Sequence, residues 1–129
     1  MRVFDFTVET EKSVAETVAA LEDSLQQRKF GVLWKFDLQS KLQEKGIDFT
    51  SPYFILEVCN PVQAKRALDE TLLAGYLLPC KLVVYQEQMT TKIGLTRPTV
   101  LMGVLDNAGL AAIAQDVEEE LRNAMLEAQ

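Results

Sequence analysis

Two cysteines are the residues of this chain whose chemistry stands out. Cys59 comes directly before Asn60-Pro61, and Cys80 comes directly after Pro79, so each thiol lies where a predicted strand meets a proline. A pair of thiols could be redox-active or could hold a metal ion. The chain contains no histidine, which excludes Ser-His-Asp and Cys-His catalysis and leaves too few ligands for a zinc site. We therefore expect no metal site and no cofactor.

Cys59 has a specific physical case for reactivity. It precedes a predicted helix start, where free amide groups and the helix dipole favour a thiolate. Glu57, two residues earlier on the same strand face, opposes ionisation through like-charge repulsion. Cys59 is thus a weak candidate for a nucleophile or redox thiol. The competing interpretation is that both cysteines are small, half-buried residues of low reactivity, since free cysteine is among the most buried residue types.

Hydrophobic periodicity predicts the elements that must position these thiols. Alternation of apolar and polar residues predicts strands over 2–9, 32–38, 53–59 and 81–85, with a fifth strand at 91–95. Helical spacing predicts helices over 14–28, 62–73 and 107–121, and a short helical turn over 39–45. Ser13 and Glu16 form the signature of a capping box, while Asn60 and Pro61 suit the cap and first turn of the second helix. Gly31 and Gly75 are expected to end the first two helices.

This order of elements predicts an α+β fold with the sequence β-α-β-β-α-β-β-α. We expect a two-layer sandwich in which helices cover one face of a largely antiparallel, five-stranded sheet, in a split βαβ-like arrangement. Strands 53–59 and 81–85 are then parallel, which places Cys59 and Cys80 about 17 Å apart. A disulfide requires Cα atoms within about 7 Å, so we expect none within one chain. The length of 129 residues predicts a single compact domain over 1–129.

The sheet face opposite the helices is expected to remain open. In strand 32–38 the side that carries Trp34 and Phe36 is expected to be buried, which leaves Lys35 on the open face with Glu57 and Tyr85. Charged, aromatic and aliphatic groups are mixed there in a way that a purely solvated face seldom needs. The predicted ligand-binding residues are Lys35, Glu57, Cys59, Asn60, Pro61 and Tyr85.

Charge and composition exclude other classes of partner. The formal net charge is −6 and the basic residues are scattered, which argues against binding to nucleic acid. The first six residues carry an acid and no long apolar run, so we expect neither a signal peptide nor a transmembrane segment, no membrane partner and a cytoplasmic location. The acidic run 118–120 is expected to be a solvated helix face.

The segments Leu56-Glu57-Val58-Cys59-Asn60-Pro61 and Gly75-Tyr76-Leu77-Leu78-Pro79-Cys80-Lys81-Leu82-Val83-Val84-Tyr85 resemble the domain of unknown function 302 family, which comprises small bacterial and archaeal proteins of similar length. The resemblance covers nearly the whole chain. It implies a compact α+β fold, a homodimer, and no established activity or cofactor. Members of that family often carry a small residue at the position of Cys59 and an aliphatic one at the position of Cys80, so a shared function cannot rest on the thiols.

Three hypotheses of function follow. The leading one is an uncharacterised, soluble homodimeric domain without enzymatic activity, which binds a small ligand or a partner on the open sheet face near the Cys59-Asn60-Pro61 turn. The second is a thiol-dependent redox or transfer enzyme that uses Cys59. The third is a purely structural dimer in which a second copy consumes the open face.

Overall fold

Five strands form one antiparallel sheet in the computed structural model, which describes residues 2–129. The strands are β1 (Asp5–Thr10), β2 (Gly31–Asp37), β3 (Tyr53–Cys59), β4 (Cys80–Glu87) and β5 (Thr90–Thr96), in the order β1-β5-β4-β3-β2. Every neighbouring pair is antiparallel. The expected α+β class is therefore confirmed, whereas the split βαβ arrangement with parallel β3 and β4 is wrong.

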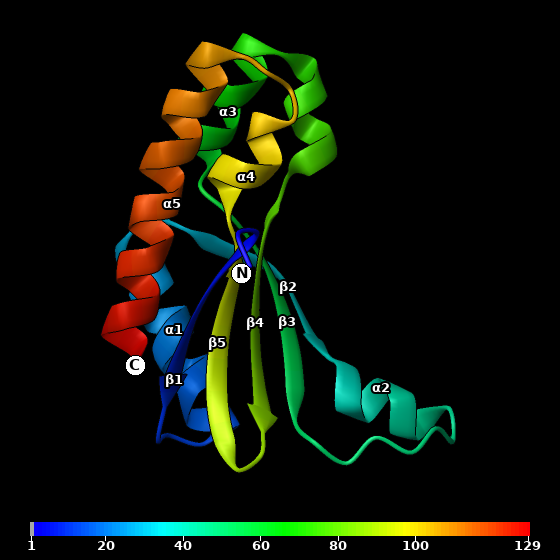
Figure 1. The fold of residues 1–129 in the computed structure, drawn as a ribbon. Helices are drawn as coiled ribbons and strands as arrows, with labels where there is room; N and C mark the ends of the chain where they lie inside the picture. Colours follow the sequence, from blue (N-terminus) through cyan, green and yellow to red (C-terminus); the bar gives the residue numbers. More distant parts are fainter. Residues whose placement is uncertain (1) are drawn as a thin grey trace.

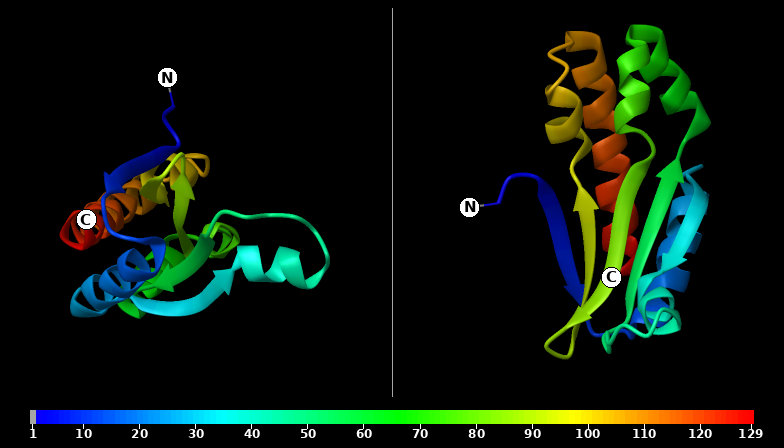
Figure 2. Two further views of the ribbon diagram at one scale, coloured as in Figure 1. Left: turned by 90° about the horizontal axis from the view of Figure 1, so that it is seen from below. Right: turned by 90° about the vertical axis from the view of Figure 1, so that its right-hand side faces the viewer.

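Two long helices, α1 (Val14–Gln27) and α5 (Ala108–Ala128), lie side by side against one face of this sheet (Figures 1 and 2). The capping box predicted at Ser13 and Glu16 is present, with two reciprocal hydrogen bonds of 3.1 Å. The side chain of Asn107 accepts a hydrogen bond of 2.9 Å from the amide of Leu110 and starts α5. The helices bury apolar stripes against the inner sides of the strands, among them Leu21, Leu25, Leu56, Leu82, Ile93, Leu110 and Leu121.

The first helix ends in a Schellman motif rather than at Gly31. Lys29 takes up a left-handed conformation with φ of 65°. The backbone amide of Phe30 then donates to the carbonyl of Leu25 at 2.9 Å, and the backbone amide of Lys29 donates to the carbonyl of Gln26 at 3.0 Å. Because the Phe30 ring is buried, its hydrophobic contact stabilises the turn. Gly31 is already the first residue of β2.

Three short helical segments lie beyond one end of the sheet, at the top of Figure 1. They are α3 (Pro61–Glu70), the 3₁₀ helix η1 (Leu72–Leu77) and α4 (Pro98–Gly103). The 3₁₀ helix contacts both α3 and α4, and α3 and α4 contact α5. Asn60 caps α3 as predicted, accepting hydrogen bonds from the amides of Val62 and Gln63 at 3.0 and 3.3 Å. Gly75 does not end this helix but lies inside η1. Since β3 and β4 pair directly, α3 extends the end of the sheet instead of covering its face.

A β-bulge in β2 reverses the expected faces of that strand. Val32 pairs with Val58, but Trp34 pairs with Glu57, so Leu33 is the extra residue. Side chains alternate along a strand, and one inserted residue exchanges the two faces from that point on. Trp34 and Phe36 therefore lie on the open face, and the prediction that they are buried is wrong.

Between β2 and β3 the chain forms α2 (Leu38–Glu44), which has no buried residue. Asp37 caps it through the amide and hydroxyl of Ser40 at 3.0 and 2.9 Å, and Gly46 follows it with φ of 74°. In the right-hand view of Figure 2 the sheet lies in front of α1 and α5, and α2 stands out toward the viewer. This helix thus projects on the side of the open sheet face.

Candidate functional site

The structure does not bring the predicted site residues together in one place. Glu57 and Tyr85 lie on the open sheet face, where β3 and β4 carry them. Cys59 and Asn60 line a cavity at the end of the sheet, and Pro61 is exposed in the first turn of α3. The prediction that Lys35 lies on the open face is wrong. The bulge in β2 turns Lys35 to the helix-covered face, where its Nζ lies 3.3 Å from a carboxylate oxygen of Glu22 in α1.

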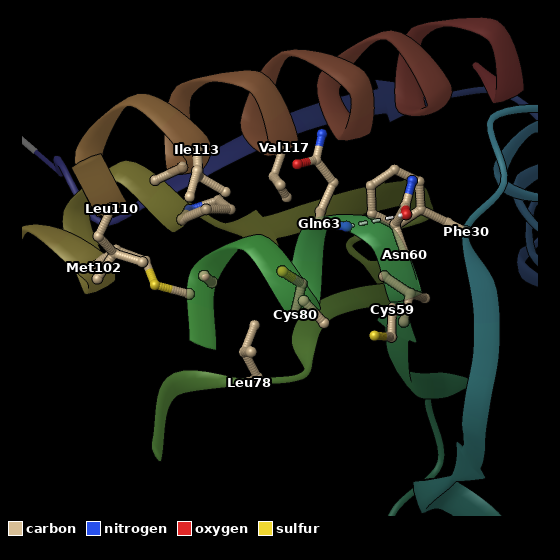
Figure 3. A pocket seen from close by; sticks show the side chains of 15 residues that line it. Phe30, Cys59, Asn60, Gln63, Leu78, Cys80, Met102, Leu110, Ile113 and Val117 are labelled. Atoms are coloured by element: carbon tan, nitrogen blue, oxygen red, sulfur yellow. Dashed lines mark hydrogen bonds between the residues drawn. The ribbon is translucent and has the colours of Figure 1, made fainter. Parts of the chain in front are cut away.

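The cavity at the end of the sheet is small and almost wholly apolar. Figure 3 shows it between α5, which contributes Leu110, Ile113 and Val117, and the strand ends that carry Cys59 and Cys80. Its volume is about 30 Å³, which is the space of roughly one water molecule. The Asn60 side chain at its rim is already used to cap α3. In this form the cavity therefore has no room for a ligand of several atoms.

The two thiols that line this cavity are free but poorly suited to nucleophilic chemistry. The expected separation was wrong, because β3 and β4 are antiparallel and Cys80 pairs with Val58, next to Cys59. Burial raises the pKa of the Cys59 thiol. Burial, followed by the neighbouring Cys59, raises the pKa of Cys80 to about 12. The apolar surroundings thus outweigh the start of α3, and both thiols are protonated at neutral pH.

We expect both thiols of the native protein to react slowly with Ellman's reagent at neutral pH. Each unit by which a thiol pKa is raised lowers the thiolate fraction about tenfold, so Cys80 should react at least about tenfold more slowly than N-acetylcysteine. Cys59, whose pKa is also raised, should react more slowly than N-acetylcysteine as well. The release of thionitrobenzoate measures the rates, and the variants Cys59→Ala and Cys80→Ala assign them. Unfolding in guanidinium chloride should restore the rate of a simple thiol. A native thiol that matches N-acetylcysteine would instead support the thiol-dependent enzyme.

The open sheet face is organised in cross-strand rows. The central row contains Phe36, Ile55, Val83, Gly94 and Thr7, and the row nearer α2 contains Tyr53, Tyr85, Lys92 and Glu9. The third row, at the end of the sheet near η1, contains Trp34, Glu57 and Lys81.

Aromatic rings on this face form two stacked pairs, and the two rings of each pair are nearly parallel. The ring centroids of Trp34 and Phe36 are 4.9 Å apart with 10° between the ring planes. Those of Tyr53 and Tyr85 are also 4.9 Å apart, with 16° between the planes. Trp34 remains 48% exposed. The stacks therefore present flat aromatic surface that the protein's own helices do not cover.

The acidic run of α5 contains a buried carboxylate that the sequence analysis missed. Glu118 is only 5% exposed, whereas Glu119 is exposed as expected. Its carboxylate accepts hydrogen bonds from the amide and hydroxyl of Thr99 at 3.1 and 2.6 Å, and from Nε of Arg97 at 3.0 Å. Nη2 of Arg122 lies 2.9 Å away. The sequence does contain a signal for this burial. Positions 114, 118, 121 and 125 follow each other at helical spacing, and the other three positions of this stripe are buried apolar residues.

The Glu118 cluster locks elements together rather than offering a site. Burial alone would raise the pKa of Glu118, but the hydrogen bonds from Thr99 and Arg97 outweigh it and hold this pKa below its usual value. Arg97 also donates to the carbonyl of Val3, and the Arg122 guanidinium lies 4.2 Å from the centre of the Phe6 ring. The carboxylate thus ties α4 and β1 to α5, and its oxygens are fully occupied.

Two further kinds of site are not seen in residues 2–129. No three side chains of Cys, Asp or Glu come together there as ligands for a metal ion. None of the helices in this part of the chain is both long and apolar enough to cross a membrane.

These features define a two-layer α+β domain with one helix-covered and one open sheet face. The chain belongs to the family described as domain of unknown function DUF302, whose family model matches residues 6–128. It is similar to the crystal structure of an uncharacterized conserved protein DUF302 from Bacillus stearothermophilus, with 51% sequence identity and a TM-score of 0.95. That similarity covers 99% of this chain and 100% of the other. No curated protein matches the chain.

Proposed function

We propose that this chain is a binding domain without enzymatic activity, which works as a homodimer and binds a small ligand or partner through its open sheet face. The observation that carries the proposal is the pair of aromatic stacks, Trp34 on Phe36 and Tyr53 on Tyr85, on a face that no helix of the chain covers. Exposed aromatic surface rimmed by polar groups is typical of protein interaction sites. The raised pKa values of both thiols disfavour the alternative of an enzyme that uses Cys59.

The arm formed by α2 and residues 45–50 supports self-association. The side-chain amides of Gln39 and Gln43 donate hydrogen bonds to the backbone carbonyls of Thr50 and Phe49 at 2.6 and 3.1 Å, and these bonds hold residues 45–50 against α2. It nevertheless buries none of its helical residues, and Ile47 is 53% exposed. Phe49 of the arm contacts Tyr53 on the sheet, with 6.4 Å between the ring centroids, but the exposed apolar side chain of Ile47 needs a surface from elsewhere. In a two-fold dimer each arm meets a surface that the same sequence provides.

The charges of the open face are compatible with a second copy despite the net charge of −6. Glu57 pairs across the strands with Lys81. Lys92 lies 2.6 Å from Glu87 and 3.9 Å from Glu9. Because acids and bases alternate on this face, two copies can approach without facing a surface of one sign.

Sedimentation velocity tests the proposed dimer. We expect the native protein to sediment as a dimer at micromolar concentration. Replacing both Trp34 and Phe36 by alanine should raise the dimer dissociation constant about 100-fold, because central aromatic residues dominate interface energies. Val104→Ala is the matched control, since Val104 is 78% exposed but lies between α4 and α5. A native protein that is monomeric at these concentrations would contradict the proposed self-association.

A further inference from the structure

The open face contains a hollow whose floor is the backbone of Gly94. The hollow has a volume of about 220 Å³. Its walls include Phe4, Thr7, Tyr53, Val83, Tyr85 and Thr96. It lies over β1, β5 and β4, away from Trp34 and Phe36 on the edge strand β2.

The backbone conformation does not account for a glycine at position 94. Gly94 pairs regularly with Thr7 on one side and Val83 on the other, with no register shift in either pairing. Its φ is not in the left-handed region. A glycine inside a strand weakens the strand, and besides bulges and bends it marks places where a ligand or another backbone approaches closely. Here the missing side chain leaves a recess beside Val83, and Phe4, Tyr53 and Tyr85 are among the residues that line it.

Space at Gly94 is tightly limited. A Cβ atom added there would lie 2.9 Å from Cγ2 of Val83 and 3.5 Å from Oγ1 of Thr7. Val83 therefore leans over part of the space that a side chain would fill, and the hollow is the remainder. Even an alanine would press Val83 outward and narrow the hollow.

The polar groups around the hollow select for hydrogen bonding rather than for charge. Thr7 donates its hydroxyl to Asp5 at 2.5 Å, and Nε of Arg2 lies 3.3 Å from the same carboxylate. The charges of Arg2 and Asp5 therefore compensate each other. Lys92 and Glu87 form a similar ion pair close by. Thr96 and Tyr85, which each carry a hydroxyl group, also line the hollow. Burial raises the pKa of Tyr53, so its phenol is a neutral donor.

We infer that this hollow binds an uncharged, planar aromatic molecule, with its ring over the Gly94 backbone and beside the ring of Tyr85. Sites for small molecules are concave and largely apolar, with a few polar groups that set orientation. A flat ring fits the space that Val83 leaves above the Gly94 backbone, and aromatic contact with Tyr85 adds to the burial of apolar surface. This inference rests on the proposed role of the open face and names the class of ligand. It does not depend on the dimer contact at Trp34 and Phe36.

Titration of the native, ¹⁵N-labelled protein with indole tests the inference. We expect saturable shifts that concentrate on the amides of Thr7, Gly94 and Thr96. Cyclohexanol, an uncharged but non-planar probe, should bind at least about tenfold more weakly, since it cannot stack. Shifts without saturation, shifts centred on the cavity at Cys59 and Cys80, or equal binding of cyclohexanol would each overturn the inference.

Two variants probe the hollow itself. Gly94→Ala should weaken indole binding at least about tenfold, because the new methyl group and the displaced Val83 occupy the floor. Tyr85→Leu keeps the floor and removes the aromatic wall, so it provides an independent test if the first variant does not fold. Val104→Ala should bind indole like the native protein. Unchanged affinity in Tyr85→Leu would contradict the inference.

The proposed ligand site and the proposed dimer can be contradicted independently of each other. A native protein that sediments as a monomer but binds indole at Gly94 would leave the inference standing and remove the proposed dimer. A protein that sediments as a dimer but gives no saturable shifts with indole would remove the inference and leave the dimer standing.

Discussion

Replacing Glu118 by alanine is expected to lower the free energy of unfolding by about 3 kcal/mol. The carboxylate is buried and accepts hydrogen bonds from Thr99 and Arg97, with Arg122 beside it. Its removal leaves the amide and hydroxyl of Thr99 and part of two guanidinium groups without their partner. Losing one member of a buried, hydrogen-bonded charge cluster costs more than losing an exposed ion pair. Urea unfolding at a single protein concentration, followed by circular dichroism, measures this change.

Two matched variants separate this effect from a general loss of helix stability. Glu119→Ala changes the adjacent residue of α5, which is exposed, and should alter stability by no more than about 0.5 kcal/mol. Glu118→Gln preserves the shape of the side chain and can still accept a hydrogen bond from Thr99. Its loss of stability should therefore lie between the losses of the two alanine variants. If Glu118→Ala and Glu119→Ala are equally stable, the cluster does not lock α4 to α5.

The contribution of Glu118 should also depend on pH. Its folded-state pKa lies below the ordinary value of 4.5, so the unfolded chain binds a proton at higher pH than the native protein does. The stabilisation is therefore fully present above that ordinary value and is lost as the pH falls through the lower folded-state pKa. The stability difference between the native protein and Glu118→Gln should shrink correspondingly in acid.

Local signals allowed much of the secondary structure to be predicted. The capping box at Ser13 and the Asn60-Pro61 helix start each depend on residues within one turn of the chain, and the structure confirms both. Strand pairing depends instead on contacts between distant residues. Periodicity identified β3 and β4 but could not show that they are antiparallel neighbours, and so the two cysteines were placed too far apart.

The candidate site was harder to predict because a single inserted residue changes which side chains share a face. Leu33 is not distinguished by its type, yet the bulge at this residue moves Trp34 to the open face and Lys35 to the side of Glu22. The placement of Glu57 and Tyr85 on the open face needed only the alternation within β3 and β4 and is correct. The hollow at Gly94 could not be predicted, because it depends on the register of three strands at once.

The native protein is expected to lose up to about 4 kcal/mol more stability than Cys80→Ala between pH 9 and pH 12, at about 1.4 kcal/mol per pKa unit. The thiol of Cys80 has a pKa of about 12 in the folded protein, against 9.0 for a free thiol. Above pH 9 the unfolded chain releases this proton while the native chain keeps it. Stability falls with rising pH wherever the unfolded state binds fewer protons.

The measurement is a series of urea unfolding curves for both proteins at increasing alkaline pH. Tyrosine and lysine residues titrate in the same range, but they are common to both proteins, so the difference between the two curves isolates Cys80. Cys59→Ala should follow the native curve more closely, since Cys59 is less deeply buried. Parallel curves for native protein and Cys80→Ala would mean that the thiol ionises freely in the fold. Such a thiol would be available as a nucleophile, and this result would favour an enzyme that uses these cysteines.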